Sequence, residues 1–570
     1  MIKAAKNTFS SWATGGVLLQ ILAATACAAA ASSPVNVMAP VNGYSLSEDG
    51  LIQFSAIAFD TAGKIVGTGD EEYASQFTDA HRIDGRGRTV LPGLIDAHGH
   101  VAGLGEALHT VNLFNVPSKQ EALDRIAAHD RKYPGQEWIR GRGWNQVLWT
   151  VREFPSASDL DAVVAKRPVW MRRVDGHAGW ANSQALKLAG ITDDTLDPPG
   201  GKILRDRNGR ATGVLIDRAM DLVDMVIPAY TKDDIRMHIR DAAKQLLSEG
   251  ITSAHDPGVD VTTIEVYLSM ADAGELPLRS YVMVSGAGAN LDAVGKPIKG
   301  YGDDFVTVAS VKIYDDGALG SRGAALLQPY SDDPENSGLL FADASELAAD
   351  VRKANEAGFQ ANIHAIGDRA NRAALDAFDV VQGGKPSPLR NRIEHAQVIA
   401  LRDIPRFAQL GVIAAMQATH ATSDMNMAED RVGTERIRGA YAWRRLLDSG
   451  AIIAGGSDFP VELSNPFLGL YASVTRQDRD LLPAGGWYAD QALTREEALD
   501  TFTRAAAYAA NQDDVLGTLE AGKWADFIVI DRDYFEIPAS EIDDIIVLET
   551  WIGGKRVYSA GESIGDSDQY

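Results

Sequence analysis

Cysteine is almost absent from this chain. Among 570 residues the only cysteine is Cys27, which lies near the N-terminus. A single cysteine cannot form an intramolecular disulfide, so the fold has to be stabilised by packing and by any metal that it binds. A metal site in the rest of the chain would have to use histidine, carboxylate or a less common ligand, because no thiolate is available there.

Positive charge is also in short supply. The chain has 54 lysines and arginines against 78 aspartates and glutamates, which gives a formal net charge of −24. Such an acidic surface argues against nucleic acid and against anionic lipid as partners. No internal repeat or long low-complexity tract is visible, and a hydrophobic content of 45% is ordinary for a globular protein. The length allows one large domain with additions, or two to four domains.

The first 33 residues have the composition of a secretory signal peptide. Lys3 and Lys6 precede an apolar stretch over residues 12–26, which is too short to form a stable transmembrane span. Two interpretations of Cys27 stay open: a lipid-anchored N-terminus, or ordinary cleavage in the alanine-rich stretch that follows. The second is favoured, because Ala24 stands where a lipobox prefers leucine. Either way, the protein is expected to be exported, to the periplasm or the medium.

From residue 251 onward, strand and helix patterns alternate. Together with a strand that ends near His98, they make eight β units, which predicts an α/β fold of the (β/α)8 TIM-barrel type. A capping box at Thr231 opens a helix that Gly250 closes, and another at Thr494 opens a helix through Ala510. The seven later strands are predicted at 251–255, 278–284, 308–314, 359–364, 391–395, 412–417 and 452–457.

The rest of the chain is predicted to flank or interrupt this barrel. Residues 34–90 read as short strands, and residues 511–570 read as strands again, so the two segments are expected to form one small β-sandwich. The barrel then takes residues 91–510. Residues from about 110 to 230, including a hairpin around Asn208-Gly209, are predicted to be a domain inserted after strand 1. An insert at that end of a barrel usually shapes the substrate pocket.

Polar side chains recur at the ends of the predicted strands, where a barrel presents its catalytic groups. His98 and His100 are two residues apart, so in a strand they would point to the same side and could share one cation. Such a pair is weak on its own. It gains weight from the other residues at strand ends, which are Lys312, His364, His395 and Asp458.

These segments together resemble a known family, the metal-dependent amidohydrolase superfamily. The similarity is greatest to amidohydrolase family 3, the YtcJ-like branch that includes N-substituted formamide deformylase, and it covers nearly the whole chain after residue 33. The motifs that carry it are Pro92-Gly-Leu-Ile-Asp-Ala-His-Gly-His100, Val311-Lys-Ile-Tyr-Asp-Asp-Gly-Ala-Leu-Gly-Ser-Arg322, Asn362-Ile-His-Ala-Ile-Gly-Asp368, Arg392-Ile-Glu-His-Ala396, Gln417-Ala-Thr-His-Ala-Thr-Ser-Asp424, Gly455-Gly-Ser-Asp-Phe-Pro460 and residues 516–531.

The resemblance implies a role for each matching residue. His98 and His100 would hold one metal ion, His364 and His395 a second, and Lys312 would bridge both as a carbamate formed with CO2. Asp458 would be a metal ligand and the general base. The same superfamily also contains mononuclear members, in which the lysine is unmodified, so one metal and two metals both stay open. Zinc is the first expectation, and manganese, iron and nickel suit the same ligands.

Three further residues are weaker candidates for substrate binding. His177 lies in the insert, in a segment that resembles a family motif. Arg322 could bind a substrate carboxylate in bidentate fashion, or could form an ion pair with an acidic residue of its own loop. His420 follows strand 7 and could line the pocket.

The resulting hypothesis is an exported hydrolase that cleaves a non-peptide carbon–nitrogen bond in a small amide-type molecule by metal-activated hydroxide. Zinc alone lowers the pKa of bound water to about 7. Two alternatives keep the barrel and change the reaction, to ester or lactone hydrolysis or to deamination. The third is a non-catalytic scaffold, which is disfavoured because all six ligand positions are filled. A homo-oligomer is compatible with the sequence, which does not define the oligomeric state.

Overall fold

The computed structural model describes residues 34–47, 49–173, 178–198 and 201–561. The predicted signal peptide, including Cys27 with its lipid-anchor alternative, lies outside the described residues. So does His177. Among the helices that the structure describes, none combines the length and the apolar character needed to span a bilayer.

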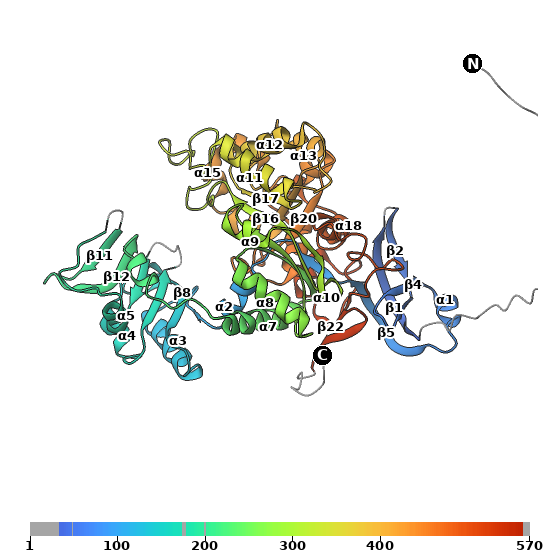
Figure 1. Ribbon diagram of the computed structural model, residues 1–570, viewed down its shortest axis with the longest axis horizontal. Coiled ribbons are helices and arrows are strands. Elements are labelled where there is room, and N and C mark those ends of the chain that lie inside the picture. Colours follow the sequence, from blue (N-terminus) through green and yellow to red (C-terminus); the bar gives the residue numbers. More distant parts are fainter. Residues whose placement is uncertain (1–33, 48, 174–177, 199–200, 562–570) are drawn as a thin grey trace, which may run out of the picture.

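A nearly closed barrel of eight parallel strands forms the centre of the molecule (Figure 1), which confirms the predicted fold class. The first and last strands meet where the Ala97 amide donates a hydrogen bond of 2.9 Å to the Gly455 carbonyl. In order around the barrel, the strands are β6 (Leu94–Asp96), β13 (Ile251–Val259), β14 (Arg279–Ser285), β16 (Val306–Tyr314), β17 (Gln360–Ala365), β18 (Arg392–His395), β19 (Ile413–Gln417) and β20 (Ile453–Gly456).

Helices between the strands cover the outside of the barrel. In α7 (Lys232–Ser248) the Thr231 hydroxyl accepts a hydrogen bond from the Asp234 amide, and Gly250 follows with a φ of 86°, so both predicted ends are confirmed. The helix predicted from Thr494 to Ala510 is wrong as one piece: it divides into α18 (Arg495–Thr501) and α19 (Arg504–Ala509). The other main helices are α8 (Val261–Asp272), α11 (Ala344–Glu356), α12 (Asp368–Gln382), α13 (Ile404–Leu410), α14 (Ala418–Asp424), α15 (Ala428–Arg436), α16 (Trp443–Asp448) and α17 (Pro466–Thr475).

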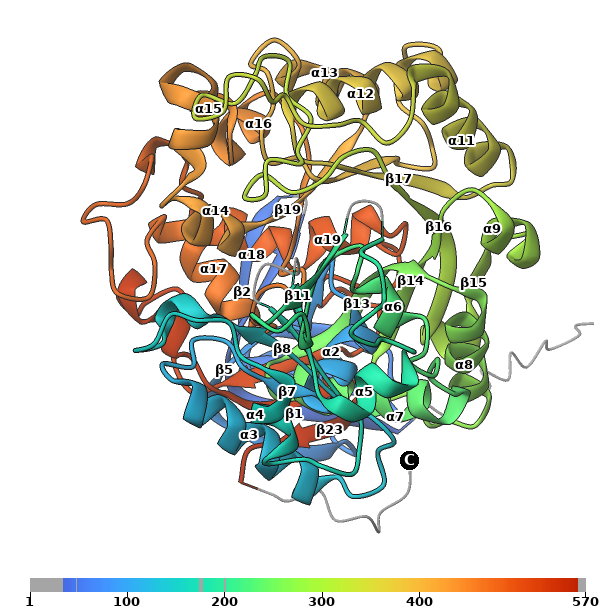
Figure 2. The same cartoon turned by 90° about the vertical axis from the view of Figure 1, so that its left-hand side faces the viewer.

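Residues between β6 and β13 begin with a short helix, α2 (Val101–Leu108), and then build a sheet of their own. In Figure 1 this sheet lies on the opposite side of the barrel from the terminal sheet, and Figure 2 shows it in front of the barrel. Trp144 and Trp180 are fully buried in its core. Its strands, in spatial order, are β11 (Gly201–Arg205), β12 (Ala211–Asp217), β10 (Ala178–Ala181), β9 (Val169–Arg173), β8 (Ile139–Trp144) and β7 (Val111–Asn112), accompanied by α3 (Lys119–Lys132), α4 (Ala157–Asp161), α5 (Ser183–Leu188) and α6 (Asp221–Asp224).

The N- and C-terminal segments come together in one eight-stranded sheet. Its two parts join where β5 runs antiparallel to β21, with Val90 opposite Val529. The N-terminal strands are β1 (Val35–Ser47), β2 (Gly50–Phe54), β3 (Ala56–Asp60), β4 (Ile65–Gly69) and β5 (His81–Pro92), and the C-terminal strands are β21 (Phe527–Ile530), β22 (Val547–Ile552) and β23 (Lys555–Ser559).

A buried ion pair connects this terminal sheet to the barrel. Arg279, at the start of β14, donates two hydrogen bonds of 2.6 and 3.1 Å to the carboxylate of Asp526, and the Gly553 amide donates a third of 2.7 Å. The side chains of Arg279 and Asp526 are only 1% and 7% exposed. Removal of one partner from such a pair leaves the other as an uncompensated buried charge.

We therefore expect Asp526→Ala to lower the free energy of unfolding by about 3–5 kcal/mol, measured by denaturant titration. The control is Arg210→Ala, which breaks a solvent-exposed pair with Asp206 in the insert and should leave the denaturation midpoint nearly unchanged. Equal midpoints for the two variants would contradict a stabilising role for the Arg279–Asp526 pair.

Candidate active site

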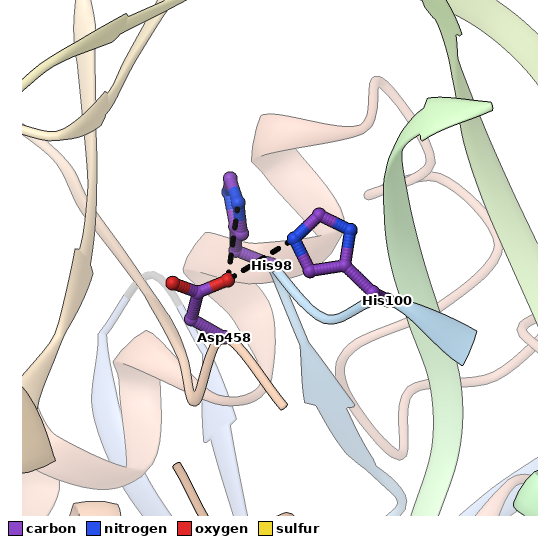
Figure 3. A group of neighbouring side chains, drawn as sticks. All are labelled: His98, His100 and Asp458. Carbon is purple, nitrogen blue, oxygen red and sulfur yellow. Dashed lines mark ion pairs between the residues drawn. The ribbon is translucent and has the colours of Figure 1, made fainter. Parts of the chain in front are cut away.

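Two histidines and an aspartate converge at the barrel mouth (Figure 3). One oxygen of Asp458, Oδ1, lies 3.2 Å from His100 Nε2 and 3.8 Å from His98 Nε2. The expectation that His98 and His100 lie in one strand is wrong, because β6 ends at Asp96 and His100 caps the short helix α2. Their convergence depends on the turn that links the strand to the helix.

That turn is held by the buried carboxylate of Asp96. It accepts hydrogen bonds from the backbone amides of His98 (3.0 Å) and Ser457 (3.1 Å), and from the Ser457 hydroxyl (2.7 Å). Gly99 is required between the histidines, since a Cβ at this position would lie 2.2 Å from the ring of Phe459. Contacts within the protein itself thus hold residues 96–100 against residues 457–459.

A second group shares the same aspartate. His395, His420 and Asp458 have ligand atoms within 4.8 Å of one another, and all three side chains are buried. His395 (φ 74°) and Asp458 (φ 62°) both occupy the left-handed region, which non-glycine residues rarely adopt. Strained backbone of this kind is concentrated at functional sites, where it directs a side chain that a regular strand would point elsewhere.

Lys312 and His364 stand beside these two groups. Lys312 Nζ lies 3.1 Å from His98 Nε2, and the ring of His364 has its centroid 4.5 Å from that of His395. Asp315 and Asp316 follow Lys312 closely in the sequence, but no ion pair joins either of them to Lys312 among the described residues. Asp316 instead accepts hydrogen bonds from three backbone amides, those of Ala325, Ile366 and Gly367.

Residues that we did not predict orient two of the histidines. Glu394 has its carboxylate against Nδ1 of His98 and is itself paired with Arg392. Gln417 Oε1 lies 2.7 Å from Nδ1 of His395. An oxygen acceptor at Nδ1 holds the proton there and leaves the Nε2 lone pair for a cation. The buried Nε2 of His364 likewise has no hydrogen-bond partner among the described residues. This donor set fits a divalent metal.

Burial sets the charge of these groups. It lowers the pKa values of His98, His364 and His395 well below the ordinary value, so the rings are neutral at pH 7 and able to bind a cation. Burial alone would raise the pKa of Asp458, but the contact with His100 and the nearby His395 hold it well below its usual range. The neutral imidazoles of His98, His364 and His395 therefore lie beside an ionised carboxylate.

The remaining candidates differ in position. His420 lies in the cluster, with Nε2 3.7 Å from Asp458 Oδ2. Arg322 is in an ion pair with Asp332 at 2.9 Å, which corresponds to the alternative in which it pairs with an acidic residue of its own loop. Tyr314, which we did not predict, places its half-exposed ring 5.5 Å from that of His364. It lies two residues after Lys312 on β16, and this period-two spacing was the sequence signal that could have identified it.

A parallel (β/α)8 barrel presents its active site at the carboxyl ends of its strands, and neutral histidines beside a carboxylate at that place suit a metal-dependent hydrolase. The model of the amidohydrolase family, Amidohydro_3, matches residues 82–558. YtcJ of Bacillus subtilis (strain 168) is 32% identical over 508 residues, which cover 87% of this chain and 94% of YtcJ. The chain therefore belongs to the amidohydrolase family and is a hydrolase, as the motifs in its sequence predict.

Two more comparisons agree. The N-substituted formamide deformylase of Arthrobacter pascens is 28% identical over 516 residues, covering 87% of this chain and 93% of the deformylase. The crystal structure of a metal-dependent hydrolase from Pyrococcus horikoshii OT3 matches with a TM-score of 0.76 at 28% identity, covering 89% of this chain and 99% of that protein.

The lysine at the centre of the site gives a prediction for the metal-free protein. Burial lowers the pKa of Lys312 to about 8, so its neutral amine forms at lower pH than that of an ordinary lysine. Acetic anhydride, a small electrophile that reacts with neutral amines and does not itself titrate, should therefore acetylate Lys312 at a rate that rises with pH and levels off above about pH 8. The modification rate of a lysine peptide in the same mixture should keep rising with pH until the pH approaches the peptide's pKa of about 10.4. Peptide mapping by mass spectrometry measures both, and coincident profiles would contradict the prediction.

Proposed function

We propose that this protein hydrolyses a non-peptide carbon–nitrogen bond in a small amide-type molecule. The observation that carries the proposal is the set of ring-nitrogen partners: Glu394 and Gln417 each place an acceptor behind a histidine, so that His98 and His395 present lone pairs to the same space beside Asp458. Residues whose rings are held in this way are suited to bind a cation rather than to fill a core.

The residues proposed to hold the metal ions are His98 and His100 at one position and His364 and His395 at the other, with Asp458 and a carbamylated Lys312 completing the set. The lowered pKa of Lys312 favours the neutral amine from which a carbamate forms. When bound, a divalent metal such as zinc makes water more acidic and polarises a carbonyl oxygen. Manganese, iron and nickel suit the same ligands.

Asp458 is proposed to move the proton. In amide hydrolysis the oxygen of water adds to the carbonyl carbon, one proton leaves the water, and the carbon–nitrogen bond breaks as the nitrogen gains that proton. Asp458 is ionised and close to His100, and can accept the proton and return it to the leaving nitrogen. The products are a carboxylic acid and an amine, and the charge of Asp458 is restored.

The cellular location rests on sequence alone. Residues 1–33 have the composition of a signal peptide, so we propose a periplasmic or secreted enzyme, with a lipid anchor at Cys27 as the alternative. The binding partner that we propose for this enzyme is its small-molecule, amide-type substrate.

Metal content tests the proposed site. We expect about two metal ions per wild-type chain when the protein is prepared with bicarbonate and without chelator, and fewer in Lys312→Ala, because the proposed carbamate would help to hold the ions. Elemental analysis against protein concentration gives the ratio. About one ion in both proteins would indicate a mononuclear site with an unmodified lysine, and no uptake at all would contradict a metal-dependent hydrolase.

A matched pair of chromogenic compounds tests the bond that is cleaved. para-Nitroformanilide and para-nitrophenyl formate differ only in a nitrogen or an oxygen at the scissile bond. We expect the wild type to release para-nitroaniline from the anilide, and Asp458→Asn to lower kcat by about 10²–10⁴-fold, the range for loss of a general base. If the enzyme cleaves the ester but none of a panel of anilides and formamides, the result would favour an esterase.

A further inference from the structure

His420 differs from the two metal-facing histidines in the atom that holds its ring. Its Nδ1 lies 3.0 Å from Nε2 of Gln397, an amide nitrogen. An amide nitrogen carries two hydrogens and no available lone pair, so Gln397 donates and Nδ1 of His420 accepts. With Nδ1 acting as the acceptor, the ring proton of His420 must be on Nε2.

This is the opposite tautomer to that of His98 and His395. Those two rings face an oxygen acceptor at Nδ1, which leaves Nε2 as a bare lone pair. His420 instead presents an N–H group to the same space. Although its Nε2 is close enough to His395 and Asp458 to form a metal-binding group by distance alone, a protonated nitrogen cannot donate a lone pair to a cation.

The N–H group of His420 has no hydrogen-bond partner among the described residues. Its Nε2 is buried, and Asp458 Oδ2, at 3.7 Å, is beyond hydrogen-bonding distance. A buried donor that lacks an acceptor costs free energy, so such groups in a site are usually satisfied by the molecule that binds there.

The segment that carries His420 is held from both sides. Gln417, the last residue of β19, orients His395, and His420 follows three residues later in the first turn of α14. Gln397 is itself buried, and its backbone carbonyl accepts a hydrogen bond of 2.7 Å from the Tyr441 amide. These contacts place the His420 donor next to the ring of His395.

We propose that His420 is a hydrogen-bond donor to the oxygen of the scissile carbonyl, and that Gln397 is the positioning residue that keeps its proton on Nε2. This inference rests on the proposed function, since it concerns the substrate of the same site. Negative charge grows on that oxygen as water adds to the carbonyl carbon, and a fixed N–H group stabilises it more than it stabilises the substrate. No proton is transferred from His420 in this role.

The tautomer can be measured without any substrate. Nitrogen-15 spectra of histidine-labelled, zinc-loaded protein distinguish protonated from bare ring nitrogens, and the His420 signals are those that disappear in His420→Gln. We expect a proton on Nε2 in the wild type and on Nδ1 in Gln397→Glu, because a carboxylate can only accept. The matched control is Gln417→Glu, which replaces one acceptor by another and should leave His395 protonated on Nδ1. A metal-bound or bare Nε2 of His420 in the wild type would overturn the proposal.

Two substitutions of His420 separate a donor from a ligand. His420→Ala should keep the wild-type metal content and lower kcat for para-nitroformanilide by about 100-fold, the effect of removing one oxyanion donor, with KM changing less than threefold. His420→Gln, which retains an N–H donor, should recover part of that loss. Loss of a metal ion in His420→Ala would show a ligand and overturn the proposal. If no amide is cleaved but the tautomer and metal results hold, the proposed function fails while the assignment of His420 as a donor stands.

Discussion

The site depends on a carboxylate that joins the first and last strands of the barrel. Asp96 is fully buried, and its oxygens accept hydrogen bonds from the backbone of His98 and from the amide and hydroxyl of Ser457. Burial raises the pKa of Asp96 to about 7, and the hydrogen bonds from Ser457 and His98 act against that rise. His98 and Asp458 come from opposite ends of the barrel sequence, and this seam brings their side chains within 3.8 Å.

Around this seam, hydrogen-bond partners decide what each ring can do. An imidazole can be a metal ligand or a hydrogen-bond donor at Nε2, and the atom that contacts Nδ1 determines which of the two it is. Glu394 and Gln417 place oxygens there, whereas Gln397 places a nitrogen. Glu394, Gln417 and Gln397 thus divide similar histidines into different chemical roles, and backbone strain at Asp458 completes the arrangement.

Much of the barrel could be predicted, because period-two and helical patterns, capping boxes and glycine stops are local features. The later strands begin within two residues of their predicted positions. The failures have physical causes. The helix predicted from Thr494 is interrupted at Phe502 and Thr503, where the Phe502 carbonyl accepts a hydrogen bond of 2.7 Å from the Ile95 amide of β6. Strand geometry led us to predict that His98 and His100 point to the same side. Their convergence instead depends on a turn, which the hydrogen bond between Asp96 and the distant Ser457 holds in place.

The sequence by itself determined the family, the barrel and the identity of the polar residues at its strand ends, since each is written in contiguous motifs. Only the tertiary structure decided which atoms meet. Glu394 lies beside His98 although 296 residues separate them, and Gln397 donates to His420 from a different strand end. A motif records residue types, whereas the proton position on a buried ring follows from the atom that packs against it, and folding alone supplies that neighbour.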